Sequence, residues 1–164
     1  MTHTILNWIY ASPVSHAIRS YSGLFLVIRF SHFVAMMFLV VSISKVDLRL
    51  MGLAEKRTPV TELIAEILPW TWRAFFVAAM TGSLLFISNA PVFYGNESFR
   101  LKILLIALAG VNMALFHWVA YRGVAAWDSD GPTVFSAKLA GALSLALWIA
   151  VALLGFRTVF TAGH

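Results

Sequence analysis

A run of apolar residues from Gly23 to Ser44 dominates the pattern of this chain. A helix needs about 20 residues to cross a bilayer core of ~30 Å, so the run is long enough to span a membrane. Arg29 and His32 interrupt it, and ionisable side chains inside a span are costly enough to indicate a functional role. Three more apolar runs follow, which predicts four spans.

The bounds of these spans follow from charged residues, Pro, Gly and Trp at the ends of the apolar runs. The spans are expected at about 23–46, 73–91, 102–122 and 134–156. An amphipathic helix lying in the interface is expected over about 4–21, and a loop with a short interfacial helix over 54–66. The predicted fold class is therefore all-α, a four-helix transmembrane bundle with an N-terminal interfacial helix, forming one integral membrane domain over residues 1–164.

Small residues at four-residue spacing predict close helix packing. The pairs are Ala78/Gly82, Ala79/Ser83, Ala137/Gly141 and Ala140/Ser144. Gly52 is expected to end the first spanning helix, which continues past the apolar run through Asp47 and Arg49. These two charged residues are expected to sit, solvated, at the membrane interface.

Composition agrees with a membrane class, because 60% of the 164 residues are hydrophobic and 12% are charged. The formal charge of +5 comes from basic residues that flank the apolar runs. They form no patch with interleaved aromatic residues, so we expect no nucleic-acid partner. The chain has no cysteine, which excludes disulfides and thiolate metal sites.

The distribution of Lys and Arg predicts an orientation, since these residues favour the cytoplasmic side. One side has seven: Lys45, Arg49, Lys56, Arg57, Arg73, Arg122 and Lys138. The other side has four, with Arg29 left out because it lies inside a span: Arg19, Arg100, Lys102 and Arg157. The loops after the first and third spans are therefore expected in the cytoplasm, and both termini in the periplasm of a Gram-negative cell.

Two histidines lie inside spans, His32 in the first and His117 in the third. Neutral imidazoles from two helices of a membrane bundle are what haem b needs as axial ligands, and Arg29, one turn from His32, is suited to pairing with a propionate. Helix rise places the two histidines roughly 10 to 16 Å apart in depth, which weakens a shared haem. The alternatives are a buried His32 that hydrogen-bonds Ser31, Ser42 or a facing helix, and an interfacial His117 beside Trp118 and Tyr121.

Other chemistry has weaker support in the sequence. His3, His16 and His164 are expected on one side of the membrane and, with His32, are a minor candidate for a metal site. No metalloprotease, nucleophile-elbow, phosphate-loop or dinucleotide motif is present.

Four short segments resemble an uncharacterised family of small four-span bacterial membrane proteins. They are Val46-Asp47-Leu48-Arg49-Leu50, Pro69-Trp70-Thr71-Trp72, Thr81-Gly82 and Phe116-His117. The resemblance implies a multi-pass protein of the bacterial inner membrane and brings no established activity. In that family a first-span histidine matches His32, while an acidic residue often stands at the position of Arg29. The layout is also loosely similar to membrane cytochrome b subunits, an analogy of architecture.

Two functions of different class follow from the sequence. The first is a subunit of a redox or respiratory-type complex that binds haem b through His32, His117 or both and exchanges electrons with quinone. The second is a cofactor-free accessory or anchor subunit that packs in the bilayer against other membrane or periplasmic subunits, or against copies of itself.

Overall fold

The computed structural model describes residues 2–54, 57–128 and 132–161, and every regular element in that part of the chain is a helix. Four helices are long and apolar enough to cross a membrane. They are α3 (Ser22–Leu50), α4 (Val60–Ser88), α6 (Glu97–Leu115) with its continuation to Ala126, and α7 (Phe135–Thr161). The expected all-α four-helix bundle is thus confirmed, and the chain is a multi-pass membrane protein.

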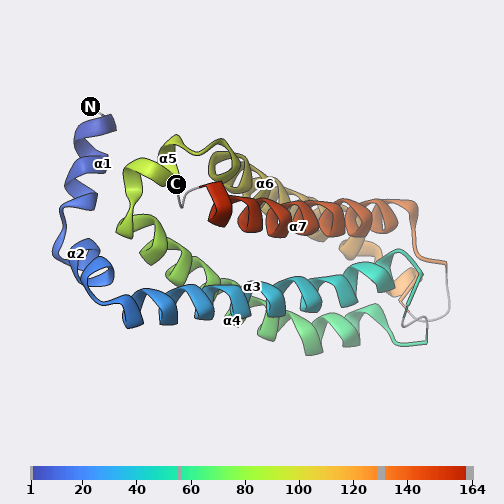
Figure 1. Cartoon of the computed structure of the whole chain (residues 1–164). Helices are drawn as coiled ribbons and strands as arrows, with labels where there is room; N and C mark the ends of the chain where they lie inside the picture. The colour runs from blue at the N-terminus through green and yellow to red at the C-terminus, as the bar shows by residue number, and fades with distance from the viewer. Residues whose placement is uncertain (1, 55–56, 129–131, 162–164) are drawn as a thin grey trace.

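The N-terminal segment is two helices, where one was expected. α1 (Thr2–Tyr10) ends before Ser12, whose hydroxyl caps α2 (Pro13–Ser20) by accepting from the Ser15 amide at 3.2 Å. Pro13 favours a helix start because its missing N–H is not needed there. Both helices lie across one end of the bundle (Figure 1), where α1 contacts α5 (Ala90–Gly95) and α2 contacts α3 and α4.

Gly52 ends the first span as expected. Its φ of +74° is the left-handed conformation that glycine adopts most readily. The Leu53 amide donates to the Leu48 carbonyl at 2.9 Å and the Gly52 amide donates to Arg49 at 3.0 Å, a pairing that satisfies the last carbonyls of α3.

The second spanning helix differs from the expectation at its start, because α4 begins at Val60 and not near residue 73. The short interfacial helix expected here is instead continuous with the span through Pro69, while residues 57–59 precede it as a loop. Its apolar face explains this: Val60, Leu63 and Ile64 are all buried, so the segment packs as part of the bundle. The predicted helix start at Pro59 is confirmed by its position just before Val60.

The third spanning helix changes pitch at its end. α6 continues into a π-helical turn, η1 (Phe116–Ala120), and then into a 3₁₀ segment, η2 (Tyr121–Ala126). Wide π turns inside helices are frequent at functional sites, and this one contains His117.

Packing in the bundle follows the small residues. α3 packs on α4 and α7, and α6 packs on α7, whereas α4 and α6 make at most a marginal main-chain contact in the described part of the chain. A Cβ on Gly141 would lie 2.9 Å from the Asp47 carbonyl oxygen, so only glycine allows α7 this close to α3. Ala79 and Ser83, also expected in packing, are exposed on the outside of α4.

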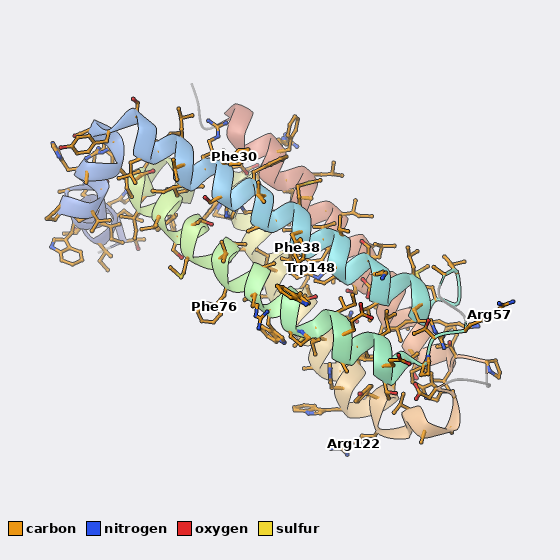
Figure 2. All side chains as sticks on the ribbon, turned by 90° about the horizontal axis from the view of Figure 1, so that it is seen from below. Phe30, Phe38, Arg57, Phe76, Arg122 and Trp148 are labelled. Carbon is orange, nitrogen blue, oxygen red and sulfur yellow. The ribbon has the colours of Figure 1, made fainter. Side chains whose placement is uncertain are left out.

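Large apolar side chains cover the outside of the bundle. Phe30 and Phe38 on α3 and Phe76 on α4 are exposed, whereas Trp148 of α7 lies among the helices (Figure 2). Such a surface suits contact with lipid chains. Arg57 and Arg122 both lie toward the opposite end from α1 and α2, on different sides of the bundle (Figure 2).

Candidate functional site

His32 is held between α3 and α4. Its Nδ1 lies 2.9 Å from the Ala78 carbonyl oxygen and 3.1 Å from the Thr81 hydroxyl. A carbonyl only accepts, so Nδ1 carries the proton in a neutral ring and Nε2 keeps its lone pair. The ring packs on Gly82, where a Cβ would lie 3.0 Å from its Cε1 atom. The interpretation of His32 as an imidazole that hydrogen-bonds a facing helix is therefore confirmed.

His117 has a similar hydrogen bond in a different place. Its Nδ1 lies 2.9 Å from the Met113 carbonyl oxygen, one turn back along its own helix. Its ring centroid lies 5.4 Å from that of Tyr121 and 5.3 Å from that of Phe116. His117 also lines a cavity inside the bundle, which His32 does not.

The structure does not bring the two histidines together. Asn112 on α6 donates to the Ala140 carbonyl on α7, and the residue after Ala140, Gly141, packs on Asp47 of α3. Asn112 and Asp47 therefore lie at a similar depth in the bundle. From His32 to Asp47 the rise along α3 is roughly 22 Å, and His117 lies about one turn beyond Asn112. The separation therefore exceeds that expected from the sequence.

Haem b shared by both histidines does not fit this arrangement, because the two imidazoles would have to face one iron from opposite sides. A haem held by one of them stays a prediction, and the free Nε2 of each ring is the atom that would bind iron. Arg29, the expected propionate partner, is exposed on α3. No group of three or more His, Asp or Glu in the described residues is placed to hold a metal ion, and His164 of the histidine hypothesis lies outside those residues.

The cavity lies between the four spanning helices and has a volume of about 210 Å³. Most of its lining is apolar or aromatic and includes Leu39, Phe75, Phe116 and Trp148. Trp72 of α4 and Met113 of α6 also line it, and they are 46% and 39% exposed. The exposed residues of the lining thus all come from these two helices, although Ala74 of α4 and Ala109 of α6 also pack in one apolar cluster.

Asp47 is the acidic residue of this lining. It is only 4% exposed, and the Ser144 hydroxyl of α7 hydrogen-bonds its carboxyl group. Its Oδ2 atom is buried without a hydrogen-bond partner in the described structure. The expectation of a solvated interfacial charge is wrong, because α7 packs directly on this turn of α3 at Gly141.

The other polar side chains near Asp47 are already bonded inside the protein. The Asn112 amide nitrogen donates to the Ala140 carbonyl at 2.9 Å. The Thr71 hydroxyl donates to the Ile67 carbonyl at 3.1 Å. Both bonds fix these side chains in place, so the polar end of the cavity is preorganised.

Arg49 closes the loop end of the bundle. Arg49 is 4% exposed, so the expectation of a solvated interfacial charge is wrong for this residue as well. Its guanidinium donates to the Thr58 carbonyl at 2.8 Å, to the Asp128 carbonyl at 2.9 Å and to the Thr133 hydroxyl at 3.4 Å. One side chain thus joins the two loops that follow the first and third spans.

Asp128 completes this connection by accepting from the Thr61 amide at 2.9 Å and from the Thr61 hydroxyl at 2.7 Å. Slight burial raises the pKa of Asp128. The hydrogen bonds from Thr61 and the Val60 amide, together with the charge of Arg49, outweigh it, so that the pKa lies below its ordinary value.

Sequence reasoning selected His117 among the cavity residues and missed Asp47 as a buried group. Two features of the sequence could have indicated the burial of Asp47. Asn112 marks the depth at which α6 carries a polar group, and Gly141 marks a position of close helix packing. No protein-family model, curated protein or solved structure matches this chain.

Proposed function

We propose that this chain is the membrane subunit of a redox complex that binds a quinone-class molecule in the cavity between its helices. The observation that supports this most is a cavity with an apolar, aromatic lining, one buried polar end at Asp47, and lining side chains on α4 and α6 that are exposed on the outside of the bundle. Ligand sites are commonly apolar pockets with a few convergent polar groups. A quinone has a flat ring with polar oxygens and reaches such a site through the bilayer.

The ring would lie among Phe75, Phe116 and Trp148, and its oxygen atoms near Asp47. The isoprenoid tail would leave between Trp72 and Met113 into the lipid. The accessory role deduced from the sequence remains the alternative, and it requires the cavity to bind nothing.

Cavity filling tests the proposal. In lipid nanodiscs, a short-chain benzoquinone should quench the tryptophan fluorescence of the wild-type protein in a saturable manner, because Trp72 and Trp148 line the cavity. Ala109→Leu fills part of the cavity from α6. It should weaken binding by roughly tenfold or more, because the added volume occupies space that the quinone needs.

Ala107→Leu is the matched control, since Ala107 lies on the same helix and is exposed. It should leave the affinity unchanged. Equal affinity of both variants would place the quinone outside the cavity, and the absence of saturable quenching in the wild-type protein would leave the accessory role.

A further inference from the structure

Among the described residues that line the cavity, Asp47 is the one with a buried side-chain polar atom that lacks a hydrogen-bond partner. We infer that Asp47, as a neutral carboxylic acid, donates a hydrogen bond to a carbonyl oxygen of the ligand in the cavity. The inference rests on the proposed function, and it identifies the residue that recognises the ligand and the chemical group that the ligand must present.

In the described part of the chain, no Lys or Arg side chain lines the cavity at Asp47. Ser144 hydrogen-bonds Asp47 and Gly141 packs on it from α7. The other polar side chains that line the same cavity are Asn112 on α6, Thr71 on α4 and His117 in the π turn η1. Of the two basic residues nearest along the chain, Lys45 is exposed and Arg49 donates to the loops. An ionised carboxylate without a partner is costly in an apolar interior, so the neutral acid is favoured.

A neutral acid must place its O–H on an acceptor. Ser144 hydrogen-bonds the carboxyl group, but Oδ2 has no partner. The Asn112 and Thr71 side chains donate to main-chain carbonyls, and neither is hydrogen-bonded to Oδ2. An unmatched buried donor costs free energy until it is satisfied, and a ligand carbonyl entering the cavity would satisfy it. A carboxylic acid kept neutral by an apolar site is a known hydrogen-bond donor to ligand oxygens.

The pH dependence of binding tests this role. Binding of the short-chain benzoquinone to the wild-type protein in nanodiscs should weaken by roughly tenfold or more as Asp47 loses its proton at alkaline pH, since a donor becomes a repelling charge. Asp47→Asn keeps a donor that does not titrate, so its affinity should not change with pH. Asp47→Leu should bind roughly tenfold more weakly than the wild-type protein at acidic pH, where the acid is neutral.

Glu66→Gln is the matched control, because Glu66 is an exposed acid on α4, and it should keep the wild-type pH profile. Binding without pH dependence in the wild-type protein, or the same pH dependence in Asp47→Asn, would overturn the inference while the proposed function stands. Absence of binding at every pH would overturn both.

A measurement on the wild-type protein covers the case in which the Asp47 variants do not fold. Addition of the benzoquinone should shift the C=O stretching band of a protonated carboxylic acid in an infrared difference spectrum. Saturable binding without such a shift would overturn the role of Asp47.

Discussion

Gly82 shows how one missing side chain positions an imidazole. The His32 ring lies where a Cβ on Gly82 would be 3.0 Å from Cε1, and this contact lets Nδ1 reach the Ala78 carbonyl. The sequence indicated both residues, His32 as an ionisable group in a span and Gly82 as a packing position. It did not indicate that they pack on each other, because that depends on the rotation of α3 against α4.

A double-mutant cycle between these residues measures the contact. Gly82→Ala should destabilise the protein by about 1 kcal/mol, since a well-packed interior resists added volume. In the His32→Ala background the same change should instead stabilise it by up to about 1 kcal/mol, the helix preference of Ala over Gly. Apparent melting temperatures in detergent report both effects.

Gly110→Ala is the control for this cycle, because nothing lies within 4 Å of a Cβ at that position. It should be neutral or stabilising in both backgrounds. A Gly82→Ala effect that is the same with and without His32 would show that the imidazole is not in contact with Gly82.

At the scale of elements, the loop end of the bundle depends on Arg49 and Asp128. Arg49 donates to both loops, and Asp128 binds the first turn of α4 through Thr61. The pKa of Asp128 is lowered in the folded protein, so its contribution to stability is complete above the ordinary carboxyl pKa and is lost as pH falls through the lowered value.

Acidification should therefore separate the two loops before the bundle unfolds. Below a pH of about 4 the loop around Thr58 should become more sensitive to an acid-active protease. Asp128→Asn should show this sensitivity already at neutral pH, with a loss of about 1 kcal/mol of stability because Asp128 is only partly buried. Glu62→Gln, a change at an exposed acid of the same turn, should behave like the wild-type protein. Equal proteolysis of Asp128→Asn and the wild-type protein at neutral pH would contradict this account.

The number and type of the spanning helices could be predicted from the sequence, because the length of an apolar run is a local property. The start of α4 could not, since Val60 and Ile64 pack against Phe116 and Trp127 from distant parts of the chain. Asp47 was missed for the same reason: its burial comes from the approach of α7 at Gly141. His117 could be selected by residue type alone, but its separation from His32 depends on how far α6 is displaced along α7.

For the whole molecule, the arrangement of helices gives the cavity a buried side and an exposed side. The lining residues of α3 and α7 are buried or half-buried, whereas Trp72 of α4 and Met113 of α6 are exposed. The start of α1 and the end of α7 lie at the same end of the bundle (Figure 1), which agrees with an even number of spans. Asp47 and His117 lie toward the opposite end, where the loops joined by Arg49 close the bundle. The polar end of the cavity therefore faces the side of the membrane on which those loops lie.

That side can be determined because the chain has no cysteine. Single cysteines at Thr4 in α1 and at Leu53 in the first loop are exposed in the structure and report opposite ends of the bundle. The excess of Lys and Arg at the loop end predicts a cytoplasmic location for Leu53. A membrane-impermeant maleimide should then label Thr4→Cys in intact spheroplasts and label Leu53→Cys only after lysis.

Arg57 and Arg122, both at the loop end, contribute to the excess of basic residues there (Figure 2), so replacing both with Gln should weaken the preference for this orientation. Labelling of Leu53→Cys in intact spheroplasts would reverse the orientation and place Asp47 toward the periplasmic side.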